Sequence, residues 1–125
     1  SDKEHKIKEH LFNILNEEKF SSSDYSILAD KLNAEPEKIK LLLSILEDEK
    51  LIIRLEGSLM FTKKNFDILK NSIIEFFVTS HSLSVNEFKD ISNTSRKYAI
   101  PLLEYFDKLK ITYRDGNCRR LCNNE

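Results

Sequence analysis

The chain has 125 residues, of which 40% are hydrophobic and 33% are charged, and its formal net charge is −1. This composition is typical of a folded globular chain and excludes a disordered one, and the length allows one ordinary domain or two very small ones. No apolar run approaches the roughly 20 residues of a membrane-spanning helix, and the polar start lacks an apolar signal region. We therefore expect a cytoplasmic protein without membrane contact.

The predicted elements occur in the same order twice along the chain. In the first half, the apolar spacing predicts three helices and a hairpin, over residues 6–19, 24–33, 36–49 and 51–62. In the second half, the same elements are predicted over residues 66–79, 85–91, 95–109 and 111–121. Ser84 and Glu87 have the spacing of a capping box, and Pro36 suits a first helical position.

The two halves also align with each other at a shift of about 60 residues. The apolar face of the third helix is repeated, because Ile39, Leu42, Leu43 and Leu46 fall on Ala99, Leu102, Leu103 and Phe106. Each hairpin then turns at a glycine in nearly the same register. We therefore expect a mostly α fold with small β-hairpins (α+β), built as two tandem winged-helix domains over residues 1–64 and 65–125.

Positive charge is concentrated near the C-terminus. Residues 1–65 hold eleven basic and thirteen acidic residues, whereas residues 89–125 hold eight basic and five acidic ones. A local cluster of basic side chains matters more for binding a polyanion than the net charge of the chain. The charge pattern therefore indicates a nucleic-acid surface in the second unit.

The start of the last predicted helix carries part of this charge. Ser95, Arg96 and Lys97 stand where the first unit, 60 residues earlier, has Glu35 and Glu37. Carboxylates at a helix N-terminus repel phosphate, whereas free amides with neighbouring cations bind anions. We predict that the second unit binds nucleic acid and that the first does not.

The second hairpin adds further basic residues. Asp-Gly is a strong signal for a two-residue turn, here at residues 115–116. Such a turn places Arg114 opposite Asn117, and Arg119 opposite Thr112 on the same face. A three-residue turn would place Arg120 there instead of Arg119, and the sequence leaves both registers open.

Two tyrosines stand among these cations, and bases of RNA loops stack on aromatic rings. Tyr98 and Tyr113 could each be a stacking partner or a half-buried core residue. The predicted RNA-binding residues are Ser95, Arg96, Lys97, Tyr98, Arg114, Asn117, Arg119 and Arg120.

Pro101 lies well inside the last predicted helix, where it removes one backbone hydrogen bond. Either the first turn is kinked away from the helix body, or the regular helix begins later than residue 95. Both alternatives present residues 95–97 as a distinct element.

Several functions lack support in the sequence. No Gly-x-x-x-x-Gly-Lys-Ser/Thr motif is present, so the chain has no phosphate loop of that kind for GTP. The two cysteines, Cys118 and Cys122, have no histidines at zinc-ligand spacing, so we expect no metal site and free thiols. No serine or cysteine accompanies a recognisable base and acid, so we expect no catalysis and no cofactor.

The run of residues 94–107, TSRKYAIPLLEYFD, resembles the closing signature of the bacterial selenocysteine-specific elongation factors of the SelB family. The resemblance is densest over residues 84–121, and the first unit resembles the preceding winged helix of that family more loosely. It identifies the chain as a C-terminal fragment of such a translation factor.

The resemblance implies a function. The C-terminal winged helices of this family bind the selenocysteine-insertion (SECIS) hairpin of mRNA, downstream of the UGA codon that is recoded. It implies that GTP, selenocysteyl-tRNA and ribosome binding belong to the full-length factor, that the first unit is mainly a spacer, and that the chain is a monomer.

Two other classes share the fold. A DNA-binding regulator would present polar residues along its recognition helix, but the outward positions here are Pro101, Glu104 and Lys108. A protein-interaction module would need an exposed apolar patch, which the sequence does not indicate.

Overall fold

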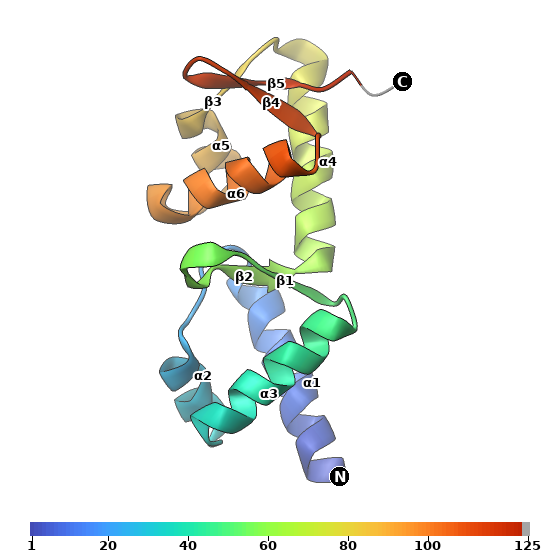
Figure 1. The fold of residues 1–125 in the computed structure, drawn as a ribbon, viewed down its shortest axis with the longest axis vertical. Coiled ribbons are helices and arrows are strands. Elements are labelled where there is room, and N and C mark those ends of the chain that lie inside the picture. The colour runs from blue at the N-terminus through green and yellow to red at the C-terminus, as the bar shows by residue number, and fades with distance from the viewer. Residues whose placement is uncertain (124–125) are drawn as a thin grey trace. The chain divides into compact units, whose positions relative to one another are not determined.

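The computed structural model describes residues 1–123. The chain forms two compact units, Ser1–Phe66 and Asp67–Glu125 (Figure 1). The division falls two residues after the one predicted from the repeat. None of the helices in the described part of the chain is both long and apolar enough to cross a membrane.

The first unit contains three helices and a two-stranded hairpin. Its elements are α1 (Asp2–Glu18), α2 (Tyr25–Leu32), α3 (Pro36–Asp48), β1 (Ile52–Arg54), a short 3₁₀ turn (Glu56–Ser58) and β2 (Met60–Thr62). Helix α1 begins four residues earlier than predicted, because Ser1 caps it and accepts a hydrogen bond from the amide of Glu4. The polar first turn contains no apolar residue, so the apolar periodicity could not reveal it.

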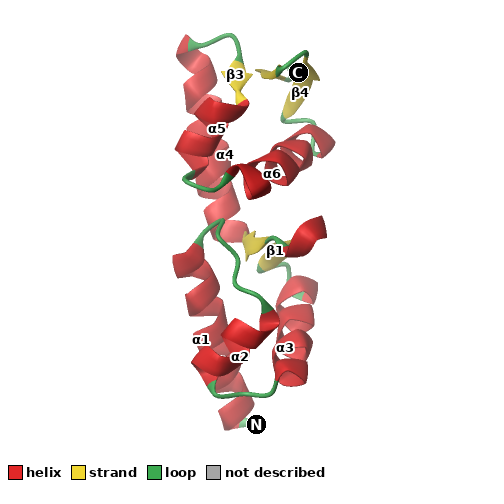
Figure 2. Ribbon diagram, turned by 90° about the vertical axis from the view of Figure 1, so that its left-hand side faces the viewer, coloured by secondary structure: helices red, strands yellow, loops and turns green. Residues whose placement is uncertain are grey.

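The second unit repeats this order with one addition. Its elements are α4 (Lys63–Thr79), whose first turn still belongs to the first unit, then β3 (Leu83–Ser84), α5 (Val85–Ser92), α6 (Arg96–Lys108), β4 (Thr112–Asp115) and β5 (Cys118–Leu121) (Figure 2). Helix α4 follows β2 directly, so the predicted join over residues 62–65 is already helical from Lys63 onward. Strand β3 was not predicted, because two residues are too short to show an alternating pattern.

Strand β3 gives the second unit a larger sheet. It pairs with β5, which gives the antiparallel order β3-β5-β4, whereas the first unit has only the β1-β2 pair. The predicted capping box is confirmed at the junction of β3 and α5. Ser84 Oγ accepts from the Glu87 amide, and the Glu87 carboxylate accepts from the Ser84 amide. The cap therefore fixes the start of α5 directly beside the sheet.

The backbone repeats at a shift of 60 residues, as the apolar pattern predicts. Asn33 and Asn93 both end a helix in the left-handed conformation, and Lys50 and Lys110 both have positive φ after the third helix. The third helices, α3 and α6, have bounds that differ by the same 60 residues. The mostly α fold with small hairpins is confirmed.

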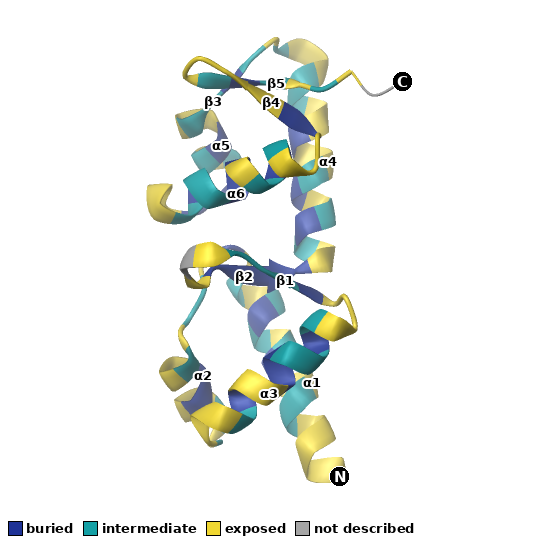
Figure 3. Cartoon of the chain, in the orientation of Figure 1, coloured by how far each residue is buried: buried dark blue, intermediate teal, exposed yellow. Residues whose placement is uncertain are grey.

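Each unit has its own apolar core (Figure 3). The repeated positions on α3 and α6 are all buried, as predicted from their spacing. In the second unit, the rings of Phe88 on α5 and Phe106 on α6 meet edge to face at 5.6 Å. Because these buried side chains hold α6 against α5, the N-terminus of α6 has a fixed position relative to β3 and the hairpin.

Candidate nucleic-acid interface

A groove in the second unit lies where α5, α6 and the β4–β5 hairpin meet. Its volume is about 400 Å³, and it is lined by Ser84, Val85, Asn86, Arg96, Ile100, Glu104, Arg114, Asn117 and Arg119. Four of the eight residues that the sequence singled out line it: Arg96, Arg114, Asn117 and Arg119. Ser95, Lys97, Tyr98 and Arg120 lie outside the lining.

The N-terminus of α6 presents free donors. Ser95 is the N-cap residue, but among the described residues its side chain makes no capping hydrogen bond. Its carbonyl oxygen accepts from the amides of Tyr98 and Ala99, which leaves the amides of Arg96 and Lys97 without a helical acceptor. Both of these side chains are exposed. Two amides, a hydroxyl and two cations are therefore available to an anion.

Lys97 and Tyr98 interact with each other. The Lys97 ammonium lies 5.2 Å from the centroid of the Tyr98 ring, which is half-buried. Helix α6 begins at Arg96, one residue after the predicted start, and runs unbroken through Pro101, so residues 96 and 97 belong to the regular helix. The carbonyl oxygen of Lys97 receives no bond from position 101, because proline has no N–H.

The hairpin turns one residue later than predicted. Asp115 still pairs with Cys118, so the turn residues are Gly116, whose φ is +63°, and Asn117. The pairing with β3, at Leu83 with Arg119, fixes β5 from its other edge and so helps to set this register. A glycine at the first turn position is the arrangement that a type II′ turn requires.

This register settles which arginines share a face. Arg114 lies directly opposite Arg119, and Thr112 opposite Leu121, so these four side chains lie on one face. The predicted pairings of Arg114 with Asn117 and of Arg119 with Thr112 are wrong, but the predicted face is confirmed. The three-residue turn is also wrong, because Arg120 lies on the other face.

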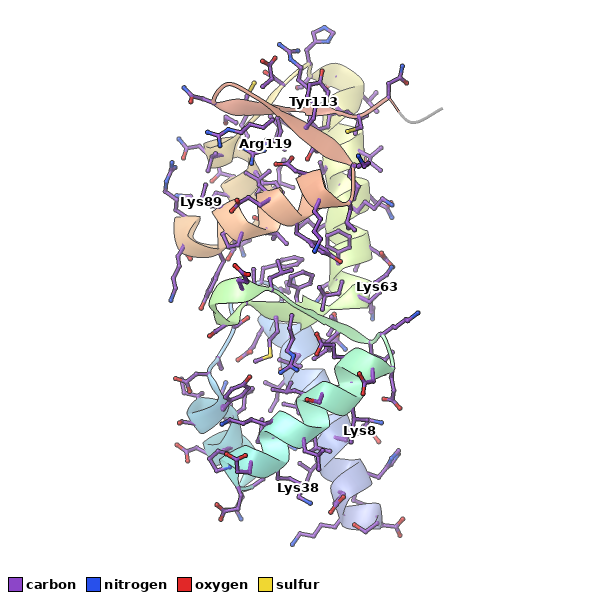
Figure 4. The ribbon with its side chains drawn as sticks, in the orientation of Figure 1. Lys8, Lys38, Lys63, Lys89, Tyr113 and Arg119 are labelled. Atoms are coloured by element: carbon purple, nitrogen blue, oxygen red, sulfur yellow. The ribbon has the colours of Figure 1, made fainter. Side chains whose placement is uncertain are left out.

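Arg119 is buried, with 5% of its surface exposed, and is held by an ion pair (Figure 4). Its Nη2 lies 2.9 Å from Asp107 Oδ2, and its Nε also donates to this carboxylate. The hydroxyl of Thr112 donates to Asp107 Oδ1 at 2.7 Å. Arg119 therefore lines the groove with its charge already compensated.

Arg120 is held on the opposite face of the hairpin. It pairs with Asp115, and its Nη1 donates to the carbonyl oxygen of His81 at 3.2 Å. Hydrogen bonding to the Asp115 carboxylate raises the pKa of Arg120 above its ordinary range. Tyr113 shares this face and is 48% exposed (Figure 4).

Arg114 differs from both neighbouring arginines. It is exposed at the rim of the groove, and its Nε donates to the carbonyl oxygen of Gly116 at 3.0 Å. No carboxylate within residues 1–123 forms an ion pair with it. Together with Arg96 and Lys97, it supplies the uncompensated positive charge at this site.

Sequence reasoning missed five groove residues. Ser84, Val85 and Asn86 enter the groove because β3 brings the start of α5 beside the hairpin, and Ile100 and Glu104 lie on α6. The sequence predicts an outward position for Glu104, but no pattern in it places Glu104 beside Arg96, Arg114 and Arg119. The capping box at Ser84 was the one local signal that could have located the α5 edge.

The corresponding surface of the first unit is organised differently. A cavity of about 300 Å³ lies beside Tyr25 and Arg54, but Arg54 donates to Glu47 with its Nη2 at 2.8 Å and its Nε at 3.1 Å. This hydrogen bonding raises the pKa of Arg54. Helix α3 begins with Glu35 as N-cap and Glu37 in its first turn. The first unit thus lacks an uncompensated arginine at this place.

The described residues contain no group of three or more His, Cys, Asp and Glu side chains that could hold a metal ion. Cys118 and Cys122 are both free and half-buried.

Comparison with known proteins gives a consistent result. Residues 75–121 match the family model described as elongation factor SelB, winged helix. A selenocysteine-specific elongation factor from Desulfomicrobium baculatum is 32% identical over 77 residues. The matched residues make up 62% of this chain but 12% of that relative, so the chain spans a small part of the curated protein.

Two solved structures are also similar. The mRNA-binding domain of elongation factor SelB from E. coli, solved in complex with SECIS RNA, has a TM-score of 0.76 and 21% identity, over 98% of this chain and 99% of that one. The bacterial selenocysteine-specific elongation factor EF-Sec has a TM-score of 0.66 and 28% identity, over 92% of this chain and 18% of that one. The tandem winged-helix fold and the resemblance to the C-terminal winged helices of SelB are thereby confirmed.

Proposed function

We propose that this chain is the mRNA-binding part of a selenocysteine-specific elongation factor, and that it anchors the factor to a SECIS hairpin so that UGA is recoded. The observation that carries the proposal is the match of residues 75–121 to the SelB winged helix. That segment includes every residue that lines the groove. The family resemblance and the cationic surface therefore coincide on the same unit.

The groove offers two kinds of contact to RNA. Free amides and the cations Arg96 and Lys97 at the start of α6 suit a phosphate group, because the helix dipole and the side-chain charges act together. Arg114 and Asn117 on the hairpin face the groove from its other side. An RNA backbone that enters between helix and hairpin would be bound from both sides.

Specificity for a hairpin loop requires contacts to bases as well as phosphates. The Lys97–Tyr98 pair at the start of α6 offers a ring on which an unpaired base can stack, and exposed Tyr113 offers a second ring on the opposite face of the hairpin from Arg114. We assign Arg120 to holding the hairpin, through Asp115 and His81, and regard its contact with RNA as indirect.

The first unit acts in this proposal as a spacer. Its equivalent helix begins with two carboxylates, and its equivalent arginine is paired with Glu47. Binding of GTP, selenocysteyl-tRNA and the ribosome belongs, in this proposal, to parts of the factor outside this chain. The chain itself binds RNA as a monomer, without a cofactor.

The proposal is tested by fluorescence anisotropy with a SECIS hairpin from the source organism, the same hairpin with a scrambled apical loop, and duplex DNA. We expect tight binding to the first only. The Arg96→Ala/Lys97→Ala variant should lose this binding. A matched variant, Lys6→Ala/Lys64→Ala, removes two exposed cations from the first unit and should keep it. Equal, weak binding of all three nucleic acids would refute the proposal.

A further inference from the structure

The two units place an acidic residue at the same position near the end of their third helix. Glu47 on α3 and Asp107 on α6 are 60 residues apart, which is the shift of the repeat. Each acid pairs with one arginine of the hairpin that follows, Glu47 with Arg54 and Asp107 with Arg119. The acid therefore occupies the same position in both units, but the arginine that it binds does not.

The two arginines come from different strands. Arg54 lies on the first strand of its hairpin, and its counterpart 60 residues later is Arg114. The residue directly across from Arg54 is Met60, whereas the residue directly across from Arg114 is Arg119. Met60 and Arg119 are both 5% exposed, so they fill equivalent buried positions. The second unit therefore has two arginines on one face of the hairpin, where the first unit has one.

Only one of these two arginines forms an ion pair with Asp107. Arg119 is held by the Asp107 carboxylate, which also accepts the hydroxyl of Thr112. Arg114 is left exposed at the groove, with a hydrogen bond to the carbonyl oxygen of its own turn. In the first unit, where Met60 cannot compete, the acid binds the arginine that corresponds to Arg114.

We propose that Asp107 and Arg119 are positioning residues for Arg114: Arg119 occupies the acid and so prevents Asp107 from drawing Arg114 out of the groove. With Arg119 bound to Asp107, the charge of Arg114 stays uncompensated. The effect on RNA affinity rests on the function proposed above. The change of partner, in which Asp107 pairs with Arg114 once Arg119 is removed, does not depend on that function.

The exchange is tested first without RNA. Arg119→Met gives the second unit the arrangement of the first, and Asp107→Glu/Arg119→Met adds the longer acid that Glu47 provides. We expect Arg114 to pair with residue 107 in both variants, as shown by its side-chain Nε–H signal in ¹⁵N NMR spectra or by a crystal structure. Should Arg119→Met not fold, the double variant still tests the idea, because it installs a pair that the first unit already contains. An Arg114 that stays exposed in the folded variants overturns the proposal.

Binding to the SECIS hairpin supplies the second readout. Arg119→Met should raise Kd about four- to sixfold at about 0.15 M salt, which corresponds to the loss of one phosphate contact. Asp107→Asn/Arg119→Met keeps the net charge of the wild type and lacks the carboxylate at position 107, so Arg114 should stay at the groove and the variant should bind like the wild type. No recovery in this variant would overturn the proposal.

A further substitution distinguishes an ion pair between Arg114 and residue 107 from a general effect of the charge at residue 107. Adding Arg114→Ala to Arg119→Met should leave Kd for the hairpin unchanged, because Arg114 is already paired with Asp107 there. Adding it to Asp107→Asn/Arg119→Met should raise Kd, because Arg114 is free to bind RNA in that variant. Equal losses in the two backgrounds would mean that residue 107 acts only as a nearby charge. Failure of the wild type to bind the hairpin would refute the proposed function, and the NMR spectra would still decide the exchange of partners.

Discussion

Arg114→Ala should reduce the salt dependence of RNA binding, whereas Arg120→Ala should leave it unchanged. Both arginines lie on the β4–β5 hairpin, so the two variants are matched in residue type and location. Arg120 is compensated by Asp115, whereas Arg114 forms no ion pair with any described carboxylate. Only the charge of Arg114 is therefore available to replace counterions on the RNA.

The magnitude follows from the number of uncompensated cations. Arg96, Lys97 and Arg114 are three, because Arg119 is neutralised within the unit as Arg120 is. At roughly 0.7 to 0.9 per phosphate, the slope of log K against log salt should be about −2 to −3. Five independent cations would give a slope of about −4.

The assay is anisotropy of a labelled SECIS hairpin over a series of salt concentrations. Arg114→Ala should make the slope shallower by about 0.7 to 0.9, and Arg120→Ala should keep the wild-type slope. A wild-type slope of −4 or steeper would refute the reasoning, because the ion pairs would then not neutralise their arginines. An equal change in both variants would refute it as well.

The remaining predictions concern stability. Ser84→Ala should lower the free energy of unfolding by about 1 kcal/mol in urea denaturation, because the capping box with Glu87 is lost; an unchanged midpoint would contradict this. Gly116→Ala should cost about 1 kcal/mol in the same assay, because φ there is +63° although a Cβ would have open space; a gain in stability would refute it. Hydrogen bonding from Lys38 lowers the pKa of Glu4 below 4.5, so this pair stabilises the fold above that pH and is lost as pH falls through the lowered pKa. In Lys38→Met the pKa of Glu4 should rise towards 4.5 in an NMR titration, and an unshifted titration would contradict the assignment.

The repeat explains how much of the fold could be predicted. The apolar faces of α3 and α6 depend on helical periodicity, and the capping box at Ser84 is a local hydrogen-bond pattern, so both are visible in sequence. The starts of α1 and α4 were missed because their first turns are polar. Strand β3 was missed because a two-residue strand is defined by its partner β5 rather than by any pattern of its own.

The sequence predicts which elements form the site, but not the register of the hairpin or the ion pairs of its arginines. The basic start of α6 and the arginines of the hairpin are evident from residue types alone. The Asp-Gly pair predicts a turn at residues 115–116, whereas Gly116 occupies the first turn position and Asp115 still belongs to the strand. Which arginine meets Asp107 depends on register and burial, and no local pattern encodes that choice.

The proposed function places the RNA at the groove of the second unit. The most direct measurement is an NMR titration of the ¹⁵N-labelled chain with the SECIS hairpin. We expect the largest shift changes at Arg96, Lys97, Arg114 and Asn117, with the amides around Arg54 of the first unit unchanged. Shift changes centred on the first unit, or none at saturating RNA, would contradict the account.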